Sequence, residues 1–269
     1  MTGLRRTLIV GSKGNLALKL KEKFPNARIV LRSEYLSWTN PRKMQDDLGT
    51  SNYDIFLAVG ITSSKANPDE LSMVNFEIPA LIAQSMIGDE SRIFTFGSIM
   101  ERDLRIVREN PYIATKFHLS EFLSRTLNPR QYLHLRLHTL YGGNSFNRDM
   151  FLGQLFYSIK ENTKFRMTSG EQVREYHHID DDLSAMETLM RGERFGIQEI
   201  SHGESIKLKD IAEQTLNYFD VPELLSLGTL SDTRSEILRP IGERNDLLGT
   251  IHFRPTIQGI ISYFEEHLR

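Results

Sequence analysis

The chain has 269 residues, of which 39% are hydrophobic and 25% charged, so it is long enough for one large domain or two modest ones. Its formal net charge of -2 gives no field that would attract nucleic acid or an anionic membrane. Because the chain has no cysteine, it cannot form disulfides, use thiolate catalysis or bind zinc through cysteine, and we expect a soluble, cytoplasmic protein.

The first predicted elements are a strand, a glycine turn and a helix. The apolar run from Thr7 to Val10 is typical of a buried strand and is too short for a signal sequence or a membrane span. A G-x-x-G-x-x-A turn and a helical pattern through Phe24 follow it. Gly11 would allow the tight turn, and Gly14 would let the backbone approach a pyrophosphate at the helix N-terminus. A purely structural glycine turn is the alternative.

The second predicted strand, Ala27 to Leu31, ends where a dinucleotide-binding protein that prefers NAD places an acidic residue on the ribose 2′-hydroxyl. Arg32 and Ser33 stand there instead, and a cation beside a hydroxyl suits a 2′-phosphate. Lys13 in the glycine turn would add a second positive charge. The sequence therefore favours NADP(H), with NAD(H) and a merely solvated Arg32 as the alternatives.

Strands and helices continue to alternate along the chain. The runs that we interpret as strands or helices are Tyr53 to Val59, Leu71 to Met86, Arg92 to Phe96, residues 112–125 and Tyr132 to Leu140. This alternation predicts an α/β fold with a Rossmann-type, doubly wound parallel sheet. Gly11, Gly60 and Ser98 follow three of the strands, so we expect them to meet in one crevice at the carboxyl edge of that sheet.

Tyr112 and Lys116 are separated by one helical turn in the helix predicted for residues 112–125. Residues at i and i+4 share a helix face, so the ammonium would lie near the phenol. A neighbouring cation lowers the pKa of a phenol and would make Tyr112 a proton donor. The alternative is a tyrosine and a lysine on the surface of an amphipathic helix.

Several motifs, in this order, resemble the extended short-chain dehydrogenase/reductase family of nucleotide-sugar enzymes. They are the glycine turn, Ser98, the Tyr112 and Lys116 pair, Arg136 to Gly142 (RLHTLYG), Arg174 to Asp181 (REYHHIDD) and Leu247 to Pro255. The resemblance covers nearly the whole chain. It implies a cofactor domain followed by a smaller substrate-binding lobe.

The resemblance implies a role for each matching residue. Tyr112 would be the general acid or base, Lys116 would hold the nicotinamide ribose and lower the pKa of Tyr112, and Ser98 would hydrogen-bond the reacting oxygen. The implied cofactor contacts are Gly11, Ser12, Lys13, Gly14, Asn15, Leu16, Arg32, Ser33, Ala58, Gly60, Asn75 and Lys116. The implied substrate contacts are Ser98, Tyr112, Thr139, Asn144 and Arg174. Arg174 would grip the substrate diphosphate, the alternative being a structural ion pair with Glu175 or Asp180.

The chain also departs from the family pattern. Only 14 positions separate Ser98 from Tyr112, a shorter interval than is usual in the family, and Thr95 is the fallback hydroxyl. Ile99 and Met100 occupy the positions at which the nucleotide-sugar dehydratases carry an acidic pair. Dehydratase activity is therefore not expected.

The histidine and aspartate clusters near residue 180 suggest no metal site. His177 and His178 are adjacent, so on a strand they would point to opposite sides, which is poor geometry for a shared metal ion. Asp180, Asp181 and Asp182 stand where a helix through Met190 should begin, and acids favour a helix N-terminus. We predict no bound metal.

The resemblance also suggests the domain and subunit organisation. Residues 1–145 would form the NADP(H)-binding domain and residues 146–269 the substrate-binding lobe, with residues 178–200 returning to the main sheet. Helices 71–86 and 112–125 would form a homodimer interface. The apolar residues predicted for that interface are Phe76, Leu81, Phe117 and Phe122.

Three functions remain open at this point. The first is an NADPH-dependent reductase that acts on a nucleotide-linked 4-keto-6-deoxysugar and uses Tyr112 as its proton donor. The second is a nucleotide-sugar epimerase, which would keep its NAD(P) bound and recycle it within each turnover. The third is a non-catalytic module that binds NADP(H).

Overall fold

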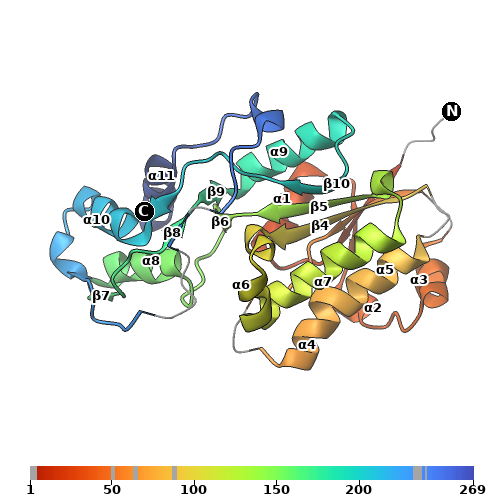
Figure 1. Cartoon of the computed structure of the whole chain (residues 1–269), viewed down its shortest axis with the longest axis horizontal. Coiled ribbons are helices and arrows are strands. Elements are labelled where there is room, and N and C mark those ends of the chain that lie inside the picture. Colours follow the sequence, from red (N-terminus) through yellow and green to blue (C-terminus); the bar gives the residue numbers. More distant parts are fainter. Residues whose placement is uncertain (1–4, 50–51, 63–65, 87–89, 233–237, 240) are drawn as a thin grey trace. The chain divides into compact units, whose positions relative to one another are not determined.

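The computed structural model of the chain describes residues 5–49, 52–62, 66–86, 90–232, 238–239 and 241–269. The chain divides into two compact units, which are shown in Figure 1. The first unit comprises Met1–Leu137 and Leu183–Ile200, and the second comprises His138–Asp182 and Ser201–Arg269. Within the described residues, no helix combines the length and the apolar character needed to cross a bilayer.

The first unit is built around one parallel sheet. Its elements are β1 (Arg6–Val10), α1 (Asn15–Lys23), β2 (Arg28–Val30), α2 (Arg32–Tyr35), α3 (Pro41–Leu48), β3 (Tyr53–Leu57), α4 (Pro68–Ser72), the π-helix η1 (Met73–Glu77), α5 (Ile78–Ser85), β4 (Arg92–Ser98), the 3-10 helix η2 (Ile99–Arg102), α6 (Leu104–Glu109), α7 (Pro111–Thr126), the 3-10 helix η3 (Pro129–Gln131), β5 (Tyr132–Leu137), most of α9 (Ile179–Arg191) and β10 (Gly196–Glu199). The strand order is β10-β5-β4-β3-β1-β2, and every pairing is parallel. The predicted doubly wound α/β fold is confirmed, with its topological switch point between β1 and β3.

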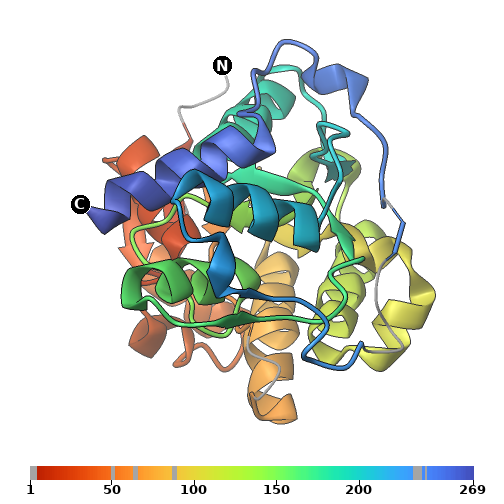
Figure 2. The ribbon, with the colours of Figure 1, turned by 90° about the vertical axis from the view of Figure 1, so that its left-hand side faces the viewer.

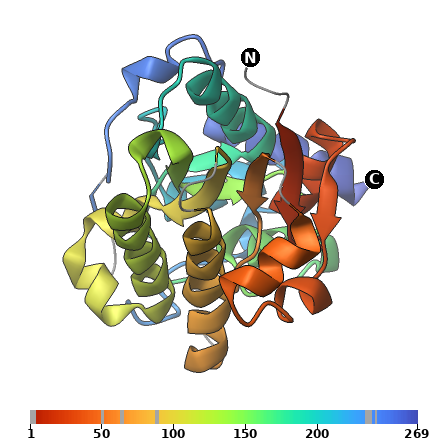
Figure 3. The same cartoon turned by 90° about the vertical axis from the view of Figure 1, so that its right-hand side faces the viewer.

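Alternate residues of the central strands pack on opposite faces of this sheet. Leu8 and Val10 belong to the core that α5 and α7 cover, and Figure 3 shows these two helices side by side over the sheet. On β3 and β4, Phe56 stacks on Phe94 with ring centroids 4.5 Å apart, and Phe24 stacks on Phe56 at 4.9 Å. Burial on both faces explains why these strands read as continuous apolar runs.

The helix predicted for residues 71–86 contains a π-turn. Pro79 has no backbone N–H, so the carbonyl of Asn75 cannot receive the usual i+4 hydrogen bond. Just before it, the N–H of Ile78 donates to the carbonyl of Met73, which is the i to i−5 bond of a π-helix. The π-turn therefore contains Asn75, one of the predicted cofactor contacts. The homodimer predicted through this helix stays a prediction.

The single strand predicted for Tyr132 to Leu140 is wrong, because the structure splits it. β5 ends at Leu137, whereas β6 (Thr139–Tyr141) pairs in parallel with β9 (Tyr176–His178) in the second unit. The N–H of Thr139 donates to the carbonyl of Glu175 at 3.1 Å, which joins the two segments. β10 returns to the main sheet, where it pairs with β5.

The second unit consists of helices and two-stranded ladders around its own core. Its elements are β6, α8 (Phe151–Glu161), β7 (Phe165–Arg166), β8 (Val173–Arg174), β9, the first residues of α9, β11 (Ile206–Lys207), α10 (Leu208–Tyr218), the 3-10 helix η4 (Pro222–Leu224), β12 (Leu225–Ser226), the 3-10 helix η5 (Asp246–Leu248) and α11 (Thr256–Leu268). Figure 2 shows α10 and α11 side by side. Phe264 from α11 and Leu216 from α10 are fully buried there, and Phe156 from α8 is nearly so.

Candidate active site

The glycine turn after β1 leaves space in front of a helix N-terminus. Gly11 has φ +109°, and a Cβ there would lie 2.7 Å from the carbonyl oxygen of Ala58, so the position requires glycine. Gly14 is the N-cap of α1, and a Cβ there would meet no described atom within 4 Å. The first turn of α1 carries no acidic residue. The N–H groups at the start of α1 and the positive end of its helix dipole suit a phosphate. The turn therefore fits the pyrophosphate of a dinucleotide.

Arg32 opens α2 directly after β2 and is exposed to solvent. Its guanidinium donates to Glu70 at 2.6 Å, which gives the predicted ligand of a 2′-phosphate a carboxylate partner. Ser33 and Lys13 are also exposed. A phosphate would therefore compete with Glu70 for Arg32.

The loop after β3 is held against α7 by Asn75. Its side chain accepts from the N–H of Ile61 at 2.8 Å and donates to the carbonyl of the same residue at 3.0 Å. It also donates to the Thr115 hydroxyl on α7 at 3.3 Å. A Cβ on Gly60 would lie 3.6 Å from both Asn75 Oδ1 and Lys116 Nζ. The structure thus brings together the predicted cofactor contacts Gly60, Asn75 and Lys116.

Tyr112 and Lys116 lie in the first turns of α7, as predicted. Asn110 caps this helix by accepting from the N–H of Tyr112 at 3.0 Å, and Pro111 occupies the first helical position. Lys116 Nζ lies 5.8 Å from the centroid of the Tyr112 ring. Lys116 is buried, with 7% of its surface exposed, although lysine is rarely buried without a partner. A buried ammonium beside a phenol makes this pair a candidate functional site.

The electrostatics of this pair differ from the expectation. Burial, and secondly the negative charge of Glu101, raise the pKa of Tyr112 to about 12. The expected lowering of that pKa by Lys116 is therefore wrong in direction for the protein alone. Burial lowers the pKa of Lys116 to about 8, an effect that Glu101 partly opposes. At neutral pH the pair is a neutral phenol and an ammonium.

Ser98 is fixed at the end of β4 by Glu101, a residue near Ser98 in the sequence to which the family pattern assigns no role. Ser98 caps η2, and its own N–H donates to the Glu101 carboxylate at 2.6 Å. The Ser-x-x-Glu spacing of a capping box was the available signal. Because Glu101 acts electrostatically on both Tyr112 and Lys116, this strand end lies near the pair.

Glu101 belongs to a buried polar chain beneath Ser98. The ring of His134 on β5 contacts its carboxylate at 3.1 Å through Nε2, and the Thr95 hydroxyl lies 2.7 Å from Nδ1 of the same ring. The side chains of Glu101 and His134 are both fully buried. The fallback hydroxyl, Thr95, is therefore engaged with His134. Gly97 must stay glycine because a Cβ there would clash with both His134 and Glu101.

We expect the Glu101→Gln variant to fold but to lose about 1–3 kcal/mol of stability, because a buried charged acceptor is replaced. Since Glu101 raises the pKa of Lys116, the pH at which activity is lost on the alkaline side should also fall. Thermal unfolding and a pH-rate profile would measure both effects. The control is Glu199→Gln, a change to a partly exposed acid that pairs with Arg136 at 3.5 Å. An alkaline limb that does not move in Glu101→Gln would contradict this role.

The remaining predicted contacts lie in two places. Ser12, Asn15 and Leu16 lie in the glycine turn and the first turn of α1. The predicted substrate contacts Thr139, Asn144 and Arg174 belong to the second unit. Thr139 opens β6, Asn144 is exposed, and Arg174 lies in β8, which pairs antiparallel with β11. The roles predicted for these residues stay predictions.

Comparison with known proteins agrees with this architecture. Residues 30–200 match the model of the NAD dependent epimerase/dehydratase family. Among curated proteins, the chain is similar to a CDP-abequose synthase from Salmonella typhimurium strain LT2. The two are 21% identical over 240 residues, which cover 82% of this chain and 79% of the relative.

Solved structures show the same fold. A dTDP-4-dehydrorhamnose reductase from Bacillus anthracis strain Ames, in complex with NADP, superposes with a TM-score of 0.77 at 17% identity and covers 98% of this chain and 99% of its own. A UDP-N-acetylglucosamine 4-epimerase from Methanobrevibacter ruminantium M1, in complex with UDP-N-acetylmuramic acid, also gives a TM-score of 0.77. It is 13% identical and covers 98% of this chain and 97% of its own. With the matched residues spanning more than half of its length, the chain belongs to the NAD dependent epimerase/dehydratase family and is an NAD(P)-dependent enzyme of the extended short-chain dehydrogenase/reductase type.

Proposed function

We propose that the protein is an NADPH-dependent reductase of a nucleotide-linked keto-sugar of the 4-keto-6-deoxy class, with Tyr112 as the proton donor. The observation that carries this proposal is the pair formed on α7 by half-buried Tyr112 and buried Lys116, with Lys116 beside Gly60 and Asn75. Reduction of a carbonyl needs a hydride, which bound NADPH would supply, and a proton at the oxygen. The chain must position that proton.

The protonation state of Tyr112 in the protein alone suits the donation of a proton to a carbonyl oxygen. Its pKa, raised to about 12 by burial and Glu101, keeps the phenol protonated at neutral pH. A protonated phenol is ready to donate to the oxygen of a substrate carbonyl. An epimerase must first remove a proton from a substrate hydroxyl, for which Tyr112 would have to be a phenolate. The ammonium of Lys116 would stabilise the tyrosinate that forms as the proton leaves.

The positions around Ser98 agree with a carbonyl substrate. The N–H of Ser98 is held by Glu101, so the residue is fixed where β4 ends. Its hydroxyl accepts from backbone N–H groups of η2, that of Met100 at 3.3 Å, which leaves its own proton to donate to a reacting oxygen. Ile99 and Met100 replace the acidic pair that a dehydratase of this family carries. The chain's own residues therefore supply proton transfer at the substrate oxygen and no acid for dehydration.

We further propose that the reductant is NADPH, since Arg32 follows β2 where the 2′-phosphate would lie. Two related proteins support a nucleotide-sugar function, since one is named a CDP-abequose synthase and the other a dTDP-4-dehydrorhamnose reductase. The second name also supports reduction, and that protein was solved with NADP. Glu70 partly neutralises Arg32 at 2.6 Å. We therefore expect the ion pair between Arg32 and Glu70 to reduce the difference in affinity between NADPH and NADH.

The purified protein should bind NADPH more tightly than NADH. Arg32→Ala should weaken NADPH binding by about 10-fold or more, because a charge-assisted contact to phosphate is lost, and should leave NADH binding unchanged. Glu70→Gln should tighten NADPH binding, because the guanidinium is released. Calorimetric titration with each cofactor would measure these changes. The control is Arg125→Ala, which removes another exposed arginine, paired with Glu121 at 2.8 Å on α7. Equal affinity for both cofactors, or NAD that co-purifies, would refute the NADPH preference.

A further inference from the structure

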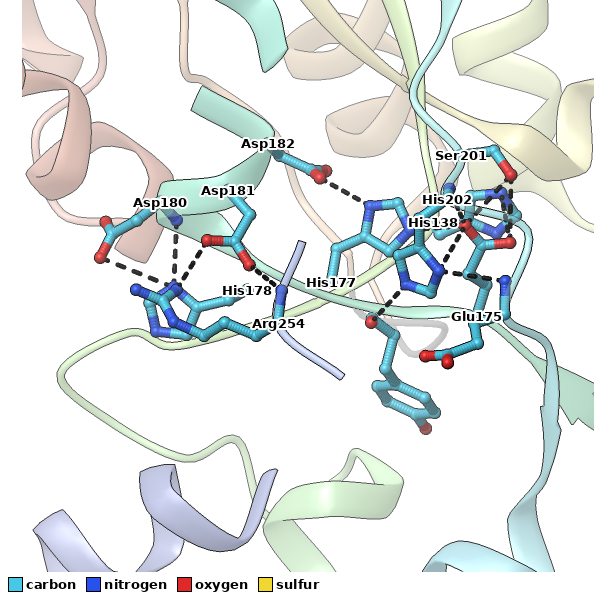
Figure 4. A network of polar contacts seen from close by, with 12 residues as sticks. His138, Glu175, His177, His178, Asp180, Asp181, Asp182, Ser201, His202 and Arg254 are labelled. Atoms are coloured by element: carbon cyan, nitrogen blue, oxygen red, sulfur yellow. Dashed lines mark hydrogen bonds and ion pairs between the residues drawn. The ribbon is translucent and has the colours of Figure 1, made fainter. Parts of the chain in front are cut away.

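Three histidines of the second unit surround one buried carboxylate, as Figure 4 shows. His138 immediately precedes β6, Glu175 and His177 lie at β9, and His202 lies in the loop after β10. The side chains of Glu175 and His177 are almost fully buried, at 1% and 0% exposure, and those of His138 and His202 are at 5% and 8%. We call these four residues the histidine cluster.

The ligand-type atoms of the cluster converge. His177 Nε2 lies 2.8 Å from Glu175 Oε1, and His202 Nδ1 lies 3.6 Å from the same oxygen. His138 Nε2 lies 3.6 Å from the other oxygen, Oε2. The ring of His177 is 4.5 Å from that of His202 and 5.2 Å from that of His138. One atom each from Glu175, His177 and His202 can be chosen so that all three lie within 4.8 Å of one another.

Outer contacts orient the two central residues. Asp182 Oδ1 lies 2.6 Å from His177 Nδ1, on the side of the ring opposite to the Nε2 that faces Glu175. A carboxylate on the far nitrogen of an imidazole is the usual outer partner of a histidine ligand. Glu175 is itself held by the Ser201 hydroxyl and by the N–H groups of His202 and Gly203.

His138 supplies a second and independent observation. Its Nε2 is buried and has no hydrogen-bond partner among the described residues, and it lies 3.6 Å from Glu175 Oε2. A polar atom buried in this way costs free energy unless something binds it. A metal ion bound by Nε2 of the neutral ring would satisfy this buried atom. Neutral imidazole is the form that binds metals.

We propose that the histidine cluster binds one divalent transition-metal ion of the zinc class through His138, Glu175, His177 and His202. Three imidazole nitrogens and one carboxylate oxygen suit Zn²⁺, whereas Mg²⁺ and Ca²⁺ prefer sets of oxygen ligands. Four protein ligands complete a tetrahedral shell, so the ion would be structural and would tie β6 and β9 to the loop at residue 202. Coordination through His202 Nδ1 would replace its 3.0 Å bond from the N–H of Glu204.

The histidine cluster belongs to the second unit, whereas Tyr112 and Lys116 belong to the first, and local sequence patterns could not reveal it. The neighbours His177 and His178 suggest a pair, but His178 instead contacts Asp180 and the Tyr141 ring. The ligands come from three segments that only the fold brings together. In the alternative account no metal binds, and hydrogen bonds hold the same residues together, with His177 as a protonated cation between Glu175 and Asp182. Metal binding distinguishes these two accounts.

The test uses the full-length protein, stripped with a chelator and titrated with Zn²⁺ and separately with Co²⁺. We expect one equivalent of Zn²⁺ by equilibrium dialysis and the visible absorption of tetrahedral Co²⁺. His138→Gln and His202→Asn should each weaken Zn²⁺ binding at least about 10-fold, and Asp182→Asn by about 10- to 100-fold. His252→Asn, which changes an exposed histidine, should have no effect.

His177→Asn is not a decisive variant, because it leaves two buried carboxylates without their counter-charge and should destabilise the unit. His138→Gln removes a neutral ring, so its fold can be checked by circular dichroism before metal is added. Absence of Zn²⁺ binding by the unsubstituted protein would overturn the proposal. Equal Zn²⁺ affinity in His138→Gln, His202→Asn and His252→Asn would also overturn it. Neither result would bear on the reductase, since no activity is measured.

Discussion

Replacing Tyr112 by phenylalanine is expected to lower kcat by about 10²- to 10⁴-fold, the contribution typical of a positioned general acid. The change removes one oxygen from α7 and keeps the aromatic ring over which Lys116 lies. Binding of NADPH should therefore be unchanged, because the phenol is needed only when the substrate oxygen takes up its proton. Steady-state reduction of a nucleotide keto-sugar, together with a cofactor titration, would measure both quantities.

A matched control is Tyr218→Phe, which removes an exposed phenol that donates to Glu265 at 2.8 Å in the second unit. It should retain full turnover. If Tyr112→Phe turns over at the unsubstituted rate, the proton donor lies elsewhere and the mechanism proposed for this site is wrong. A joint loss of NADPH binding and turnover would instead assign Tyr112 to cofactor binding.

Activity is expected to decline as the pH rises through about 8, where buried Lys116 loses its proton. In the folded protein the Lys116 ammonium is present below that pKa and is lost above it. Activity should fall with rising pH because the tyrosinate that forms in the transition state needs the positive charge of Lys116. Lys116→Met should accordingly lower kcat by about 10²- to 10³-fold, as for other single electrostatic contacts to a transition state. A pH-rate profile of the unsubstituted enzyme would locate the limb.

The same substitution should not destabilise the protein. Folding lowers the pKa of Lys116, which means that burying its ammonium at neutral pH costs free energy of folding. An apolar side chain of similar length removes that cost. We therefore expect an inactive Lys116→Met enzyme whose Tm is equal to or above that of the unsubstituted protein. An active variant, or a rate that is flat between pH 7 and 9, would contradict the role of this charge.

The sheet was predictable because each of its strands leaves a local pattern in the sequence. Phe56 and Phe94 lie in apolar runs that end in glycine or serine, and burial on both faces of a parallel sheet produces such runs. The glycine turn and the pair on α7 are also local patterns, with spacings of three and four residues. The break at His138 was missed because the flanking residues keep strand character while their partners change from β4 and β10 to β9.

What the sequence did not reveal are contacts between distant residues. Glu101 meets His134 across 33 positions, and Arg32 meets Glu70 across 38, so neither pairing leaves a local pattern. The pKa of Tyr112 was misjudged for the same reason. Spacing identifies Lys116 as its neighbour, but burial and the charge of Glu101 set the direction of the shift.

The most direct test of the reductase is a single turnover with NADPH deuterated at the transferred position and CDP-, UDP- or dTDP-linked 4-keto-6-deoxysugars as substrates. The account predicts that one NADP⁺ forms for each sugar reduced and that the product carries one deuterium at the former carbonyl carbon, detected by mass spectrometry. A nucleotide-linked hexose that the same protein inverts at a hydroxyl-bearing carbon, with no deuterium in the product and no net oxidation of NADPH, would show an epimerase and contradict the account.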